Sequence, residues 1–154
     1  MNQTEQEDYW IVKVDSTNKV SWDRTLGGTF SDRCHALLST TDGGFLLGGR
    51  SVSNSGHEKT ADSKGGGYDI WIIKLLADGT IQWDKTLGGN DNDELYDLME
   101  PTAGAFLLTG YSASATNDGD KTAPHRGEDD LWLILLEGSC AASDIAITSN
   151  VTTP

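Results

Sequence analysis

One heptapeptide occurs twice in this chain. It is written "WDRTLGG" at residues 22–28 and "WDKTLGG" at 83–89, 61 residues later. Overlaying residues 8–53 on 69–114 without a gap gives identity at 20 of 46 positions. Self-similarity at a fixed period of this length indicates a repeated structural unit.

The repeat sets the predicted organisation of the 154 residues. A third copy begins with "DDLWLILLEG" and keeps the 61-residue spacing of its tryptophan. The chain is therefore expected to hold two full units and one extra strand. The boundaries are an N-terminal extension at 1–7, a first repeat at 8–68, a second repeat at 69–129, the start of a third repeat at 130–138, and a tail or linker to a following module at 139–154.

Each unit contains four segments with the pattern of short β-strands. The first, "YWIVKV" or "IWIIKL", is apolar at nearly every position, which is typical of a strand covered on both faces. The second, "KVSWDRTL" or "TIQWDKTL", alternates apolar and polar residues after a turn and predicts a hairpin. "CHALLST" and "LYDLMEPT" are third strands, and "GFLLGGRS" and "AFLLTGYS" are fourth strands. No window shows a convincing helical period, so the fold class is all-β.

Apolar residues that recur in the repeat are expected to form its core. Two of them, Trp22 and Trp83, could instead be platforms for a ligand. The predicted core residues are Trp10, Trp71, Trp132, Trp22, Trp83, Phe45 and Phe106.

Tandem four-stranded antiparallel units are typical of β-propeller blades. Ordinary propellers have at least about four blades, which at this repeat length needs about 244 residues. Three arrangements therefore stay open: a segment of a longer array, a ring completed by other subunits, or two sheets in an open sandwich. The extra strand fits the first two, because a terminal strand often completes a propeller blade.

The strings "DIWIIKLLADGTIQWDKTLGG" and "TTDGGFLLGGRSVSNSG" resemble β-propeller repeats of large secreted and cell-surface proteins of Bacteroidetes-type bacteria, and "EKTADSKGGGYD" is similar to their linking loop. The likeness covers residues 8–137. It implies an extracellular or cell-surface scaffold or adhesion segment, and it brings no catalytic residues.

Charge and hydropathy argue against nucleic acid and membranes as partners. Eleven basic and 24 acidic residues give a net charge of −13, which repels nucleic-acid phosphates and anionic membranes. The longest apolar run, "LWLILL", is much shorter than the roughly 20 residues of a membrane helix. We therefore expect no nucleic acid and no membrane insertion. The start has no signal-peptide pattern, which is expected of a cytosolic chain or of a piece cut from a longer one.

Two acidic stretches are candidate calcium sites, because Ca²⁺ prefers oxygen ligands. "TNDGDKT" supplies Asn117, Asp118 and Asp120, and "GNDNDE" supplies Asp91 and Asp93. The alternative for Asp93, and for its repeat partner Asp32, is a carboxylate that bonds backbone N–H groups in a turn. No other cofactor is expected.

Exposed aromatic residues are the candidate ligand contacts, namely Tyr68, Tyr111 and Phe30. The long polar segments at 53–68 and 114–129 are expected to be variable surface that binds a partner or covers a neighbouring unit. Cys34 and Cys140 do not form a CxxC pair, and their disulfide state stays open.

No catalytic motif is present, since the three histidines lie in unrelated contexts and neither G-x-S-x-G nor HExxH occurs. The predicted function is a non-enzymatic binding or scaffold segment whose partner is a protein or glycan at the cell surface. Three alternatives stay open: a subunit that self-assembles into a ring or filament by strand completion, a carbohydrate-binding adhesin module, and an enzyme built from His57, His125 or acidic loop residues.

Overall fold

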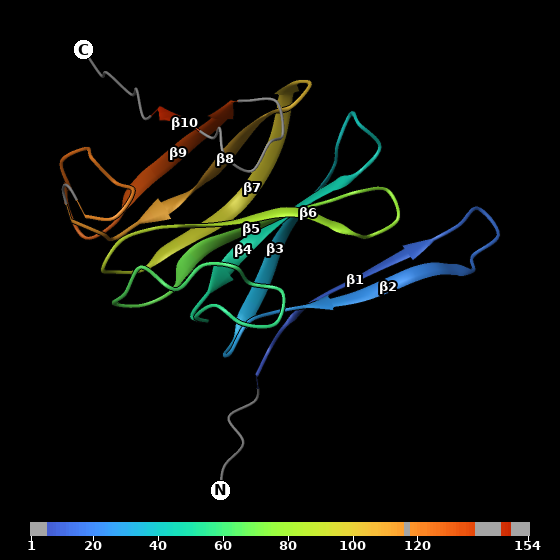
Figure 1. Ribbon diagram of the computed structural model, residues 1–154. Coiled ribbons are helices and arrows are strands. Elements are labelled where there is room, and N and C mark those ends of the chain that lie inside the picture. Colours follow the sequence, from blue (N-terminus) through green and yellow to red (C-terminus); the bar gives the residue numbers. More distant parts are fainter. Residues whose placement is uncertain (1–5, 116–117, 138–145, 149–154) are drawn as a thin grey trace, which may run out of the picture.

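The computed structural model describes residues 6–115, 118–137 and 146–148 (Figure 1). Within these ranges the fold is all-β and antiparallel, with no helix, as the sequence predicts. The strands are β1 (Tyr9–Val14), β2 (Val20–Leu26), β3 (Asp32–Ser39), β4 (Phe45–Ser51), β5 (Asp69–Leu75), β6 (Ile81–Leu87), β7 (Asp93–Thr102), β8 (Ala105–Ser112), β9 (Asp130–Glu137) and β10 (Ala146–Thr148).

The strands form a two-stranded hairpin and two four-stranded sheets. The hairpin is β1–β2, the first sheet has the order β3-β4-β5-β6, and the second has the order β7-β8-β9-β10. None of these sheets, as far as they are described, closes on itself. The chain passes from one sheet to the next after β2 and after β6, at the double glycines of the repeated heptapeptide. Each four-stranded sheet therefore joins strands from two successive sequence repeats.

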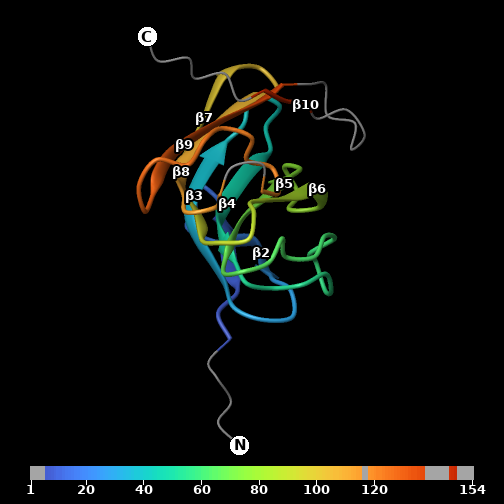
Figure 2. The same cartoon turned by 90° about the vertical axis from the view of Figure 1, so that its left-hand side faces the viewer.

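The hairpin and the two sheets stack as three layers (Figures 1 and 2). One face of β5 presents Trp71, Ile73 and Leu75, which share a buried cluster with Tyr9 and Ile11 of the hairpin. The opposite face of the first sheet shares a second cluster with β7, β8 and β9 of the second sheet. The first sheet is thus the central layer, and all seven residues of β5 are buried.

The strand "YWIVKV" is not covered on both faces, contrary to the sequence-based expectation. Trp10 is 71% exposed, whereas the equivalent Trp71 is 0% exposed. The reason is position in the stack: β1 lies in an outer layer, so Tyr9, Ile11 and Lys13 face the first sheet while Trp10 lies on the opposite, exposed face. Trp10 therefore does not belong to the core.

The other predicted core residues are buried or partly buried. Trp132 and Phe106 are buried in the cluster between the two sheets. Trp22 and Phe45 pack against the cluster under the hairpin with their ring centroids 5.8 Å apart, and Trp83 packs against the other cluster.

Both four-stranded sheets carry a β-bulge at the same place in the repeat. In the first sheet Cys34 pairs with Gly49 and Ala36 with Gly48, which leaves His35 as the extra residue. A Cβ on Gly49 would lie 1.9 Å from the carbonyl oxygen of Arg33, so only glycine fits opposite the bulge. Gly110 has the same relation to the second bulge, where a Cβ would lie 2.0 Å from the carbonyl oxygen of Glu94.

A buried lysine joins the central layer to a turn. Lys74 on β5 is fully buried, and its Nζ lies 2.9 Å from Asp42 Oδ2 and donates to the carbonyl of Leu75 at 3.0 Å. Hydrogen bonds from Thr40, from Lys74 and from the Gly44 N–H lower the pKa of Asp42 to about 2. The ion pair with the Asp42 carboxylate offsets the cost of removing the Lys74 ammonium group from water.

We expect Asp42→Asn to lower the free energy of unfolding by about 1 kcal/mol at pH 7, a value reduced for the partial exposure of Asp42. Because the folded-state pKa is lowered, this stabilisation is present above about pH 4 and disappears as the pH falls through 2. Urea unfolding of both proteins at pH 7 and pH 2.5 checks this. A difference that stays constant with pH would contradict an ionic contribution.

Candidate ligand-binding site

The two bulged residues lie together where β3 meets β7. His35 is the extra residue of the first sheet and Tyr96 that of the second. Their rings stack with centroids 6.4 Å apart and an interplanar angle of 24°. Bulges redirect side chains and are frequent beside functional sites. They bring a ring from each sheet to one place on the surface.

Two further tyrosines extend this aromatic group. The ring of Tyr111 on β8 lies 5.8 Å from that of Tyr96, and its hydroxyl is 2.9 Å from the hydroxyl of Tyr68, just before β5. Arg50 on β4 lies over the Tyr68 ring, with its Cζ 4.4 Å from the centroid. The structure therefore brings together the two tyrosines that the sequence nominated.

A single carboxylate connects the basic members of the group. Glu94 Oε1 lies 3.1 Å from Arg50 Nη1 and 3.4 Å from His35 Nδ1. The same histidine nitrogen is 3.0 Å from the carbonyl oxygen of Leu95. These contacts fix Arg50 and His35 in place without covering the exposed ring of Tyr96. We call His35, Arg50, Tyr68, Glu94, Tyr96 and Tyr111 the tyrosine–arginine cluster.

An open pocket of about 150 Å³ adjoins the cluster. It is lined by Ser31, Arg33, Arg50, Val52 and Tyr68. Arg33 forms an ion pair with Glu7 through Nε, and Arg50 uses Nη1 toward Glu94. A guanidinium carries five N–H donors in a planar fork. The pocket thus combines hydrogen-bond donors with the edge of an aromatic platform in a chain that is otherwise strongly acidic.

The cluster residues are positions at which the two repeats differ. The repeat pairs are Arg33 with Glu94, His35 with Tyr96, and Arg50 with Tyr111. Some neighbouring residues, such as Gly49 and Gly110, are the same in both repeats. The repeated bulge therefore carries different side chains in the two sheets, but many other positions of the repeats also differ, so the sequence alone does not indicate His35, Arg50 and Tyr96.

The phenols of the cluster are suited to hydrogen bonding at neutral pH. Burial and the hydrogen bond with Tyr68 raise the pKa of Tyr111 well above its ordinary value. Tyr111 thus stays a neutral phenol across the physiological range and can both donate and accept.

Phe30, the third aromatic nominated from the sequence, lies apart from these rings. It is exposed in the loop between β2 and β3, where its N–H donates to Ser53 Oγ at 2.8 Å. Its ring stacks on none of the cluster residues described above.

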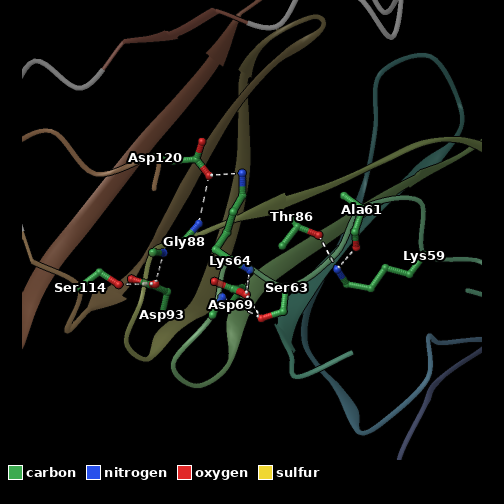
Figure 3. Close-up of polar contacts among 12 residues, drawn as sticks. Lys59, Ala61, Ser63, Lys64, Asp69, Thr86, Gly88, Asp93, Ser114 and Asp120 are labelled. Carbon is green, nitrogen blue, oxygen red and sulfur yellow. Dashed lines mark hydrogen bonds and ion pairs between the residues drawn. The ribbon is translucent and has the colours of Figure 1, made fainter. Parts of the chain in front are cut away.

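The carboxylates considered for calcium accept hydrogen bonds from the protein itself, as Figure 3 shows for Asp93 and Asp120. Asp93 Oδ2 accepts hydrogen bonds from the Gly89 N–H and from Ser114 Oγ, both at 2.9 Å. Asp32 makes the equivalent bonds to Gly28 and Ser53 at 2.8 and 2.9 Å. The interpretation of this repeated aspartate as a carboxylate that holds a turn is confirmed.

The remaining calcium candidates also have protein partners. Asp118 accepts from the N–H and the side-chain amide of Asn90 at 2.8 and 2.7 Å, and Asp120 accepts from the Gly88 N–H at 3.2 Å. Asp91 Oδ1 accepts from the Asn92 N–H at 2.8 Å, while Asn117 lies outside the described residues. Across the described part of the chain no three His, Cys, Asp or Glu side chains gather as metal ligands. Calcium binding stays a prediction.

Asp69 on β5 is a buried carboxyl beside Asp93 (Figure 3). Its Oδ2 accepts from Ser63 Oγ and from the Lys64 N–H, both at 2.8 Å, while its buried Oδ1 has no hydrogen-bond partner among the described residues. Burial raises the pKa of Asp69 to about 6, and the negative charge of Asp93 adds to the rise.

The long loops at 53–68 and 114–129 are not simply variable surface, because they contain a second repeat. An antiparallel bridge joins Gly56 to Lys59 in the first loop and Asp118 to Lys121 in the second. Both lysines are buried: Lys59 Nζ donates to Thr86 Oγ1 at 2.5 Å, and Lys121 Nζ lies 2.8 Å from Asp130 Oδ2. The spacing here is 62 residues, so an overlay without a gap misaligns "EKTA" and "DKTA".

The histidines and the described cysteine occupy separate surroundings. His57 lies at the tip of the first long loop with φ 51°, and His125 lies 3.3 Å from Asp130. Burial raises the pKa of the Cys34 thiol, which makes it a weak nucleophile at neutral pH. Cys34 is a free thiol in the described part of the chain, and Cys140 lies outside that part. The absence of enzymatic activity stays a prediction.

Comparison with known proteins gives no family. Neither the protein-family models nor the curated proteins include a match to this chain. The resemblance to propeller repeats therefore stays a prediction. No helix in the described ranges is long and apolar enough to cross a membrane.

Proposed function

We propose that this chain is a non-enzymatic binding and scaffold segment of a secreted or cell-surface repeat protein, and that it binds carbohydrate at the tyrosine–arginine cluster. The observation that carries the proposal is the meeting of three tyrosine rings and Arg50 at the junction of two sheets, beside an open pocket. The stacked sheets would act as successive blades of a propeller-like array, with the sites between them formed by loop and bulge residues.

The chemistry of the cluster suits a sugar ring. A pyranose has an apolar C–H face that packs on an aromatic ring and hydroxyl groups that need hydrogen-bond partners. Tyr96 is 56% exposed and offers the ring, while the phenol groups and guanidinium donors lie beside it. The arginines favour a saccharide that carries a carboxylate, because a guanidinium binds carboxylates in a bidentate geometry.

The side chains of the cluster hold one another in place before a ligand binds. Glu94 fixes Arg50 and His35, and the hydroxyl of Tyr68 holds that of Tyr111. A site whose side chains are fixed in advance loses less conformational entropy on binding. This arrangement favours specific recognition over a general aromatic surface.

The test is a glycan array followed by calorimetry with the best saccharide. We expect Tyr96→Ala to weaken binding at least about tenfold, because it removes the exposed stacking ring. Phe30→Ala removes an aromatic ring of similar exposure from outside the cluster and should leave the affinity unchanged.

Two results would overturn the proposal. One is the absence of any saccharide bound by the folded wild-type chain. The other is an equal loss of affinity in Tyr96→Ala and Phe30→Ala, which would place binding away from the cluster. Circular dichroism of both variants separates a lost site from a lost fold.

A further inference from the structure

We infer that two copies of this chain bind head to tail, with the outer face of the β1–β2 hairpin of one copy packed on the outer face of the second sheet of another. The head face consists of Trp10, Val12 and Val14 on β1. The tail face consists of Leu131 and Leu133 on β9 with the adjacent Leu107 on β8. The occupant is a second copy because the chain already contains the same interface twice.

The first internal interface lies between the hairpin and the first sheet. Tyr9, Ile11 and Leu26 are buried with Trp71, Ile73 and Leu75. The Tyr9 hydroxyl also donates to the carbonyl oxygen of Trp71 at 3.0 Å, and their rings are 5.0 Å apart. The hairpin thus supplies two residues of β1 and one of β2, and the first sheet supplies alternate residues of β5.

The second internal interface repeats the first with a shift of 61 residues. Ile70, Ile72 and Leu87 are the repeat equivalents of Tyr9, Ile11 and Leu26, and Trp132, Ile134 and Leu136 are those of Trp71, Ile73 and Leu75. All six residues belong to the buried cluster between the two sheets. The same pairing of faces therefore occurs wherever two layers meet.

The head face and the tail face each correspond to one side of this repeated interface, and each lacks the other side within the described chain. Leu131 and Leu133 follow Ile70 and Ile72 by one repeat, and Trp10, Val12 and Val14 precede Trp71, Ile73 and Leu75 by one repeat. Leu131 is 76% exposed, and the three head residues are exposed as well. At Leu135 the tail face has an apolar residue where the other repeats have Lys13 and Lys74, which removes a charge from it.

The head and tail faces differ from each other, so their contact is heterologous. Repeating such a contact builds a closed ring if the rotation from one copy to the next returns to the first copy, and a filament if it does not. This assembly is independent of saccharide binding, since it requires neither Tyr96 nor Arg50. It would place successive tyrosine–arginine clusters along one array.

The test uses the molar mass in solution, measured by light scattering and sedimentation up to about 1 mM chain, where even a contact of about 4 kcal/mol is populated. We expect the mass of the wild type to rise above the 16.5 kDa of one chain. Trp10→Asp and Leu131→Asp should each abolish the rise, whereas Phe30→Asp, the same charge change outside both faces, should not.

Mixing the two blocked variants gives the decisive result. Trp10→Asp keeps an intact tail face and Leu131→Asp keeps an intact head face, so an equimolar mixture should form a complex of twice the mass of one chain and nothing larger. If either variant loses its β-sheet circular dichroism, Val12→Lys or Leu133→Lys replaces it. A wild type that stays at 16.5 kDa throughout, or an assembling wild type whose variants do not combine in the mixture, overturns the inference.

Discussion

Replacing Trp71 with alanine is expected to lower the free energy of unfolding by about 3–5 kcal/mol, the range for removing a large aromatic residue from a core. Trp71 is fully buried in the central layer, and its ring lies 5.0 Å from that of Tyr9. Its indole N–H also donates to Asp84 Oδ2 at 2.9 Å. The substitution would leave a cavity between the hairpin and the first sheet. Chemical denaturation at micromolar concentration measures the change.

The matched control is Trp10→Ala, the same substitution at the same position of the repeat. Trp10 is exposed, so the free energy of unfolding of the dilute protein should change by no more than about 0.5 kcal/mol. Similar losses in the two variants would mean that both tryptophans are buried, and would contradict the stacking order of the three layers.

The second large effect concerns the buried carboxyl of Asp69. Its pKa of about 6 in the folded state exceeds the ordinary 3.8, so the folded protein holds a proton that the unfolded chain releases. The stabilisation from this proton is present in full below about pH 4 and is lost as the pH rises through 6. A rise of this size corresponds to about 3 kcal/mol.

Asp69→Asn removes the titrating group and keeps an acceptor for Ser63 and Lys64. We expect the unfolding free energy of the variant, relative to wild type, to increase by about 3 kcal/mol between pH 4 and pH 7. Asp93→Asn is the comparison at the neighbouring carboxylate. A difference between Asp69→Asn and wild type that does not change with pH would contradict the raised pKa of Asp69.

Much of the local structure could be predicted from the sequence. The alternation of "KVSWDRTL", the apolar run "IWIIKL" and the turn residues between them place most strands, because each is a consequence of local side-chain chemistry and spacing. For Asp32 and Asp93, one of the two interpretations that the sequence offers, a carboxylate that bonds backbone N–H groups in a turn, agrees with the structure.

The layer to which each strand belongs could not be predicted in this way. Strands such as β4 and β5 pair across the predicted boundary between residues 68 and 69, and a repeat can be divided between any two of its strands. The exposure of Trp10 depends on the place of β1 in the outermost of the described layers, which no local pattern contains.

The candidate site was only partly predictable for a related reason. Tyr68 and Tyr111 were nominated as aromatic residues in exposed segments, but their meeting with His35, Arg50 and Tyr96 depends on two bulges and on contact between sheets. The loop repeat of Lys59 and Lys121 was missed because one inserted residue changes the spacing from 61 to 62.

The most direct test of the account is an NMR titration of the folded chain with the saccharide that the array selects. We expect the largest amide shift changes at Tyr96, Arg50 and Tyr111, with those of the hairpin unchanged. Shift changes centred away from the tyrosine–arginine cluster, or none at about 10 mM saccharide, where an affinity of about 3 kcal/mol would still be visible, would contradict carbohydrate binding at this site.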